Sequence, residues 1–260
     1  MKIATFNVNG IRARHEVVAR WLREDAPDVA VLQETKIVDD AFPRELAEEA
    51  GYSLYLHGQK GFNGVALLSK SPLEDVTRGL PGDDADEQAR YVEGTAIGAG
   101  GSVLVCGLYL PNGNPAPGSK YDYKLAWMAR LEARARALLA EEVPFLMTGD
   151  FNVLPANIDA ARPQVMAEDA LALPATRAAW RRIVNLGLTE AFRTRQPGPG
   201  HYSYWDYQAG AFDWNHGLRI DHFLLSPAVA DRMRDCTIQG ELRARERPSD
   251  HVPVWLDLDL

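Results

Sequence analysis

Short apolar runs recur along the whole chain, and each has the length of a β-strand rather than of an ordinary helix. They occupy residues 4–9, 29–35, 65–69, 102–112, 144–152, 219–226 and 251–260. These runs are too numerous and too evenly spread for a simple parallel sheet. We therefore expect an α/β fold in which two packed mixed β-sheets are flanked by helices.

Periodicity separates the expected strands from the helices between them. In the first run Ala4, Phe6 and Val8 alternate with polar residues, which is the pattern of a half-buried strand. Apolar residues at helical spacing predict three helices. These helices are expected over Arg12–Asp25, Tyr123–Glu142 and Ala175–Asn185.

Composition limits where the chain can work and what it can bind. No apolar run approaches the ~20 residues that span a bilayer, and the first residues lack the apolar stretch of a signal peptide. We therefore expect a cytoplasmic protein without a membrane partner, folded as one domain over 1–260. Cys106 and Cys236 are too few for a disulfide framework and lack metal-site spacing. The net charge of -8 argues mildly against a nucleic-acid partner, which usually requires a basic face.

Carboxylates and carboxamides stand where several of these runs meet loops. One such residue alone would be an ordinary turn former, but a recurrent pattern is harder to dismiss. Mg²⁺ prefers hard oxygen ligands and leaves room for water and a substrate phosphate. Loops at the end of a rigid sheet are where such sites are built. The candidates are Asn7, Glu34, Asp150, Asn152, Asp221 and Asp250.

One histidine stands apart from the others. His251 follows Ser249 and Asp250 at the start of the last run. A histidine held by a carboxylate can orient a nucleophile or stabilise charge that develops on phosphorus. Asp-His pairs are common by chance, so this signal is weak in isolation. The remaining histidines are expected to be incidental: His15, His57, His201, His216 and His222.

Several motifs occur together and in a fixed order along essentially the whole chain. They include FNVNGIRAR, LQETK, GQKGFNG, TGDFN, YSYWDY, GLRIDH and PSDHVPVW. In these motifs the chain resembles the exonuclease III family of abasic-site endonucleases, within the endonuclease/exonuclease/phosphatase superfamily. LQETK and GDFN are shared loosely across the superfamily, whereas YSYWDY and GLRIDH are more specific to its DNA repair branch. The resemblance implies a four-layer αββα sandwich.

The resemblance also implies a metal site. Glu34 would be the principal Mg²⁺ ligand with Asn7 beside it, and Asp250 would be a further carboxylate of that site. Mn²⁺ would substitute for Mg²⁺. Asn9 stands where some relatives have Asp, so a second metal site has one carboxylate fewer.

The resemblance assigns the chemical roles as follows. Asp150 would activate or position the attacking water, and Asn152 would orient it. His251 would hydrogen-bond the scissile phosphate while Asp221 fixes its tautomer. Tyr109 would contact the phosphate or the leaving group. A metal and fixed donors stabilise the charged transition state, so no Ser, Cys or Thr nucleophile is needed.

Substrate choice would come from a small apolar pocket that accepts an extrahelical abasic sugar. Taking a nucleotide out of the stack costs a few kcal/mol, and least where the base is missing. The residues at the matching positions are Tyr204, Trp205, Leu218 and Ile220, although aromatic side chains are also common in cores. Candidate phosphate contacts are Lys36, Lys60, Asn112 and Lys124.

The resemblance thus implies a nuclease of base excision repair that acts on double-stranded DNA with abasic sites or blocked 3′ ends. It would cut the phosphodiester 5′ to an abasic site, leave a 3′-hydroxyl, and trim 3′ ends as a 3′→5′ exonuclease. We expect a monomer. The segment 155–174 matches no motif, so the balance between the endonuclease and exonuclease activities stays open.

Two alternatives belong to other functional classes. A superfamily phosphatase for a small phosphorylated substrate would share LQET, GDFN and SDH but would not need the YSYWDY aromatics. A non-catalytic DNA-binding module on the same fold would be expected to lose some of the residues Glu34, Asp150, Asp221 and His251, and all of them are present.

Overall fold

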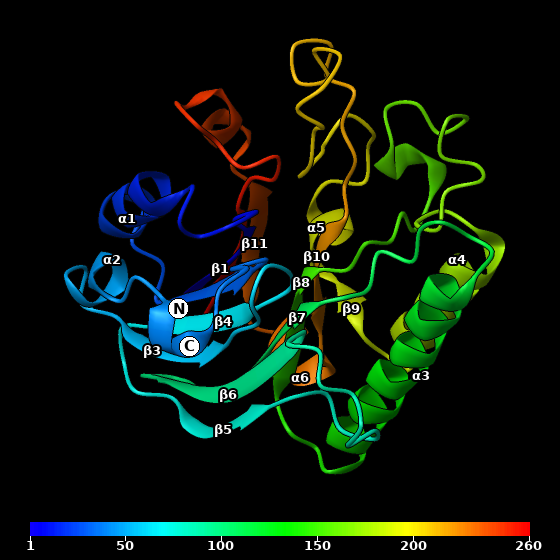
Figure 1. Cartoon of the computed structure of the whole chain (residues 1–260). Helices are drawn as coiled ribbons and strands as arrows, with labels where there is room; N and C mark the ends of the chain where they lie inside the picture. Colours follow the sequence, from blue (N-terminus) through cyan, green and yellow to red (C-terminus); the bar gives the residue numbers. More distant parts are fainter.

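The computed structural model describes residues 1–260 and places two six-stranded sheets face to face (Figure 1). The first sheet has the order β11 (Met233–Ile238), β12 (Val254–Leu258), β1 (Lys2–Asn7), β2 (Val29–Gln33), β4 (Val65–Ser69), β3 (Ser53–His57). The second has the order β5 (Glu74–Arg78), β6 (Tyr91–Gly98), β7 (Gly101–Tyr109), β8 (Phe145–Asp150), β10 (Asp221–Leu225), β9 (Thr189–Glu190). Only β1–β2 and β7–β8 pair in parallel, so both sheets are mixed.

Helices cover the two outer faces of this pair of sheets. The first sheet is covered by α1 (His15–Glu24) and α2 (Glu45–Glu48), and the second by α3 (Ser119–Ala140) and α4 (Pro174–Val184). Two short helices, α5 (Ala191–Arg195) and α6 (Pro227–Ala230), follow the later strands. The predicted four-layer αββα sandwich is confirmed. None of the helices combines the length and apolar character that a bilayer-spanning segment needs.

Three apolar layers hold the sandwich together. The middle layer lies between the sheets, where Val31 of one sheet and Val105 of the other belong to the same buried cluster. The sheets approach each other closely at Gly107, where a Cβ would lie 2.6 Å from Val31 Cγ1. The outer layers pack Trp21 of α1 against the first sheet and Trp127 of α3 against the second.

The first strand differs from its prediction as a half-buried element. Thr5 and Asn7, which form its polar face, are fully buried because the second sheet covers them. The hydroxyl of Thr5 is satisfied by the side chain of Gln33 on the neighbouring strand, 2.9 Å away. Alternation therefore identified the strand correctly but not the burial of its polar face.

The other predicted elements are present with shifted ends. The three predicted helices correspond to α1, α3 and α4, and all seven predicted strands occur. Five strands were not predicted: β3, β5, β6, β9 and β11. Of these, β3, β5, β9 and β11 lie at sheet edges, where β5 and β11 carry charged, exposed side chains and so lack a clear apolar signal.

The strand directions bring several chain segments to one end of the sandwich. β1, β2, β7 and β8 all end there, and the antiparallel β10 begins there, with Asp221 opposite Asp150 in the register. Tyr109 lies opposite Asp150 on the other side. The loops around residues 155–172, 200–217 and 240–250 rise above the sheets at this end (Figure 1, green, gold and red).

Candidate active site

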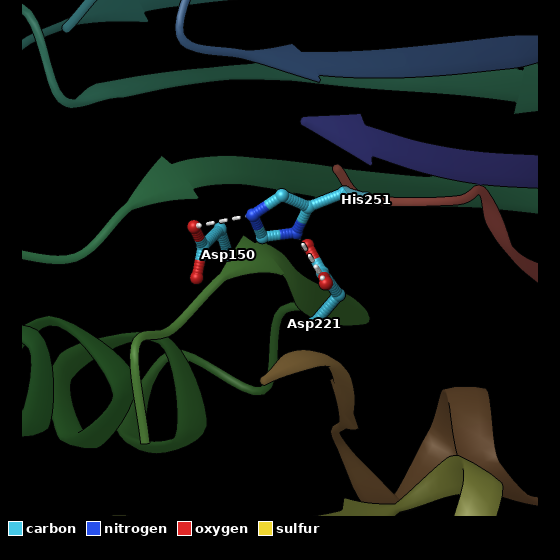
Figure 2. A group of neighbouring side chains, drawn as sticks. All are labelled: Asp150, Asp221 and His251. Atoms are coloured by element: carbon cyan, nitrogen blue, oxygen red, sulfur yellow. Dashed lines mark hydrogen bonds and ion pairs between the residues drawn. The ribbon is translucent and has the colours of Figure 1, made fainter. Parts of the chain in front are cut away.

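A buried histidine and two aspartates form the centre of this end of the molecule (Figure 2). The Nδ1 atom of His251 lies 2.9 Å from Asp221 Oδ2, and its Nε2 atom lies 3.7 Å from Asp150 Oδ2. His251 lies in the segment that leads into β12 (Val254–Leu258) of the first sheet, whereas both aspartates belong to the second sheet. The contact therefore crosses from one sheet to the other.

The charges around His251 keep a proton on its imidazole ring at neutral pH. Burial disfavours the imidazolium of His251, but the carboxylates of Asp221 and Asp150 outweigh it and raise the pKa of His251 to about 10. Burial also raises the pKa of Asp150, and the nearby carboxylates of Asp221 and Glu34 raise it further. His251 can thus donate a hydrogen bond at neutral pH, while Asp150 is more basic than an ordinary aspartate.

Asp221 is fixed by a hydroxyl that was not among the predicted site residues. Ser203 Oγ donates to Asp221 Oδ2 at 2.6 Å and accepts the backbone N–H of Asp221 at 3.2 Å. The second carboxylate oxygen, Oδ1, is buried and has no hydrogen-bond partner. Ser203 lies inside the YSYWDY motif, of which only aromatic residues were predicted to act. Asp221 is therefore aimed at His251 from a fixed position.

A second group of polar residues surrounds the amide of Asn7. Its Nδ2 atom donates to Glu34 Oε1 at 2.9 Å and to Asp150 Oδ2 at 3.0 Å, so it bridges the two carboxylates. Lys36 Nζ lies 2.7 Å from Glu34 Oε2. Burial alone would raise the pKa of Glu34, but the hydrogen bonds from Asn7 and Lys36 hold that pKa below its ordinary value. Glu34 is therefore ionised at neutral pH.

Asp250 joins this group through Asn9. The Nδ2 atom of Asn9 donates to Asp250 Oδ1 at 3.1 Å, and its Oδ1 atom accepts a hydrogen bond from Lys36. Ser249 Oγ donates to the backbone carbonyl of Asn7 at 2.7 Å, which ties the SDH motif to the end of β1. Asn9 thus connects two predicted site residues.

The donor set suits a hard divalent cation. Ligand atoms of Asp150, Asp221 and His251 all lie within 4.8 Å of one another. The carboxylates of Glu34 and Asp250 face the pocket, and the buried Oδ1 atom of Asp221 has no hydrogen-bond partner. Carboxylate and amide oxygens favour Mg²⁺ or Mn²⁺ over softer metals, and both cysteines are buried away from the site.

The backbone N–H of Asn152 and both polar atoms of its side chain form hydrogen bonds. Its N–H donates to Asp150 Oδ1 at 2.9 Å, and its Nδ2 donates to the carbonyl of Leu110 at 2.9 Å. Its Oδ1 accepts from Asn112 Nδ2 at 3.0 Å. The adjacent Tyr109 remains a phenol, because burial and the Glu34 carboxylate raise its pKa. These contacts fix the end of β8 against the loop after β7.

These polar groups line one side of a pocket of about 500 Å³. The apolar part of the lining includes Tyr204, Leu218 and Ile220, and the ring centroids of Tyr204 and His251 lie 4.9 Å apart. The predicted residues in the wall are Glu34, Tyr109, Asn112, Asp150, Asn152, Tyr204, Leu218, Ile220, Asp250 and His251. Asn7 and Asp221 lie behind the wall and bond to residues in it, and Lys36 contacts it through Glu34.

Three further predicted substrate contacts lie outside the pocket wall. Trp205 is buried behind the pocket, where its indole N–H donates to Asn215 Oδ1 at 3.0 Å and its ring packs on Phe212. Lys124 is fully buried, and its ammonium donates to backbone carbonyls, so the prediction that it contacts a phosphate is wrong. Burial lowers the pKa of Lys124 to about 7. Lys60 is exposed and lies outside the pocket wall.

Several residues of the pocket wall were not predicted from the sequence. His216, expected to be incidental, lies in the wall. The segment 155–174, which matched no motif, supplies several further wall residues. They are Arg162, Val165, Met166, Asp169 and Leu171. Their only signal in the sequence was position, because this segment directly follows the TGDFN motif at the end of β8.

Comparison with known proteins identifies the family. The model of the endonuclease/exonuclease/phosphatase family matches residues 4–251. The chain belongs to this family. The exodeoxyribonuclease III of Haemophilus influenzae is 36% identical over 265 residues, which cover 99% of each chain. These relatives are nucleases, which supports a nuclease activity for this chain. The family resemblance in the sequence motifs is confirmed.

Solved structures agree over the full length. An AP endonuclease from Archaeoglobus fulgidus is 35% identical with a TM-score of 0.94, and the match covers 100% of both chains. A 3′ phosphatase from Neisseria, solved with a product DNA hairpin, is 36% identical with a TM-score of 0.93, again over 100% of both chains. The family relatives thus act on DNA and include both abasic-site and 3′-end enzymes.

Proposed function

We propose that this chain is a metal-dependent DNA repair nuclease that hydrolyses the phosphodiester on the 5′ side of abasic sites and leaves a 3′-hydroxyl. The observation that carries the proposal is the meeting of the Asp221–His251 pair and Asp150 with an apolar pocket wall. Trimming of 3′ ends in the 3′→5′ direction would use the same groups. The relatives named for abasic-site and 3′-end reactions support both activities.

Glu34, with Asn7 beside it and Asp250 nearby, would hold Mg²⁺, and Mn²⁺ would substitute. The bound metal would neutralise charge that develops on the phosphate. The ionised state of Glu34 supports this assignment, because a carboxylate must be deprotonated to bind a cation. Lys36 occupies one oxygen of Glu34 and would keep this carboxylate oriented.

The proton chemistry would fall to groups of the chain itself. Asp150, made basic by burial, would accept the proton of the attacking water, and Asn152 would orient that water. His251, held as an imidazolium by Asp221, would donate a hydrogen bond to the scissile phosphate. Tyr109 would donate its phenolic proton to the phosphate or the leaving oxygen.

The apolar wall would select the substrate. Tyr204, Leu218 and Ile220 line a space that an abasic sugar could enter, whereas an attached base would have to be accommodated as well. The cost of leaving the helix stack is lowest for a nucleotide without a base. Trp205 would support this wall from behind, and Asn112 and Lys36 would contact the backbone phosphates.

Several properties of the whole protein belong to the same proposal. The partner would be double-stranded DNA with abasic sites or blocked 3′ ends. We propose a cytoplasmic monomer in which residues 1–260 act as one domain. The buried layer between the two sheets supports a single domain, because it is built from strands of both halves of the chain.

The decisive experiment is Mg²⁺-dependent cleavage of a labelled duplex that carries one tetrahydrofuran abasic analogue, beside an intact duplex. We expect incision directly 5′ of the analogue, with the intact strand slow or untouched. Shortening of both duplexes from their 3′ ends would make the chain chiefly an exonuclease. No cleavage of either duplex, with turnover of a small phosphoester, would replace the proposal by the phosphatase alternative.

A further inference from the structure

Lys124 has no ion-pair partner, and burial lowers the pKa of its ammonium to about 7. It is fully buried in α3, and no carboxylate oxygen lies within 4.0 Å of its ammonium. Two other basic residues of the same helix are paired: Arg130 lies 2.7 Å from Asp86, and Arg134 lies 2.5 Å from Glu93. A buried charge without a counter-charge destabilises the folded state.

The ammonium instead holds two backbone carbonyls of the site. Lys124 Nζ donates to the carbonyl oxygen of Asn112 at 2.9 Å and to that of Asn152 at 2.6 Å. The side chains of these two asparagines are bonded to each other and lie in the pocket wall. One ammonium group therefore joins the loop after β7 to the loop after β8 directly behind the wall.

Asn152 needs such support because its backbone is strained. Its φ of 47° lies in the left-handed region, which an asparagine tolerates better than most residues but still at a cost. Hydrogen bonds to Asp150, Leu110 and Asn112 use its N–H and its amide group. The remaining group, the carbonyl, is the one that Lys124 holds.

The chain also makes room for the lysine stem. Gly113, next to Asn112, has a φ of 91°, and a Cβ there would lie 2.6 Å from Lys124 Cδ. The backbone of the loop therefore lies directly against the side chain of Lys124. This close approach is what places the carbonyl of Asn112 within reach of the ammonium.

We propose that Lys124 is a positioning residue for the hydrolytic reaction, which fixes Asn112 and Asn152 in the pocket wall through their backbone carbonyls. The inference rests on the proposed function. Lys124 does not contact the substrate. Its effect passes through Asn152, whose N–H in turn holds Asp150.

The test compares Lys124→Met and Lys124→Arg with the unaltered chain on the abasic duplex. Arg136→Met is the matched control, because it removes one charge from the same helix at a side chain that is 65% exposed. We expect Lys124→Met to lower kcat by about 10- to 100-fold with little change in KM, as a displaced catalytic group does. Its melting temperature should change little, because removing a buried amine without a counter-charge offsets the loss of its two hydrogen bonds.

Lys124→Arg should recover most of the lost kcat, because a guanidinium also presents several N–H donors. Cleavage by Lys124→Met at the unaltered rate would overturn the inference and leave the proposed function intact. A lower melting temperature in both variants, with no recovery in Lys124→Arg, would show that the lysine only supports the fold. Absence of cleavage by the unaltered chain would remove the proposed function and this inference with it.

Discussion

The state of His251 depends on a competition between burial and charge. Burial would favour the neutral ring, yet two carboxylates hold the proton and raise its pKa from 6.5 to about 10. The imidazolium therefore stabilises the fold fully below pH 6.5, and this contribution is lost as the pH rises through the folded-state pKa. Asp221 is the nearer carboxylate, and Ser203 keeps it in place.

Asp221→Asn should shift the pH dependence of cleavage. Without the carboxylate, His251 loses its proton at lower pH, so the alkaline limb of kcat/KM should move by at least about one unit toward acid. The measurement is a pH–rate profile with saturating Mg²⁺. Ser71→Ala, at an exposed surface position, is a suitable control. A lower rate with an unmoved alkaline limb would show that another group controls it.

Glu34→Gln should lower kcat on the abasic duplex by at least ~10², because it removes a charge-stabilising group while keeping the shape of the side chain. The far-UV circular dichroism spectrum should be unchanged. His251→Ala should have an effect of the same order for the loss of a donor to phosphate. Near-normal turnover of either variant would contradict the role assigned to that residue.

At the scale of strands, register aligns the site. Asp150 is flanked by Tyr109 in one neighbouring strand and by Asp221 in the other, so three predicted residues are set side by side by backbone pairing alone. Gly149 makes this possible, since a Cβ there would lie 1.9 Å from the carbonyl oxygen of Leu108. The glycine of the GDFN motif therefore has a steric reason.

Gly149→Ala should destabilise the protein by about 1–3 kcal/mol or more, because the new methyl group has no space between β7 and β8. Urea unfolding followed by tryptophan fluorescence measures the change. Gly198→Ala is the matched control, since a Cβ at that position would have no atom within 4 Å. Equal stability of the two variants would show that β7 moves aside without cost.

Strand ends were the part of the site that the sequence could reveal. Glu34 and Asp150 follow apolar runs, and a recurring carboxylate at such places indicates chemistry before any contact is known. Ser203 and Lys124 could not be found in this way, because their roles depend on partners 18 and 28 residues away. The charged edge strand β5 and the wall segment 155–174 were also out of reach, since neither carries a regular apolar pattern.

For the whole molecule, the net charge of -8 has the same sign as the charge of the proposed DNA partner. Some of this charge is gathered in the site, where Glu34, Asp150, Asp221 and Asp250 lie around one pocket. Their mutual repulsion is a cost in the absence of a cation. Metal binding should therefore stabilise the fold as well as permit the reaction.

Mg²⁺ should raise the melting temperature, by the equivalent of about 2.7 kcal/mol when its concentration is 100-fold above its Kd. Differential scanning fluorimetry with and without EDTA gives this shift, and EDTA should also abolish cleavage. Glu34→Gln should reduce the shift. A melting temperature that does not change with Mg²⁺, together with cleavage in the presence of EDTA, would rule out the proposed metal site.

The bond between His251 and Asp221 joins one sheet to the other. The two partners of this hydrogen bond are thus carried by different sheets. The bond forms only when the two sheets are held in one relative position. The apolar layer between the sheets, including the close contact of Gly107 with Val31, fixes the position of one sheet relative to the other. A substitution deep in that layer should impair turnover at temperatures where the protein is still folded. On heating, such a variant should lose its activity at a lower temperature than the one at which it unfolds.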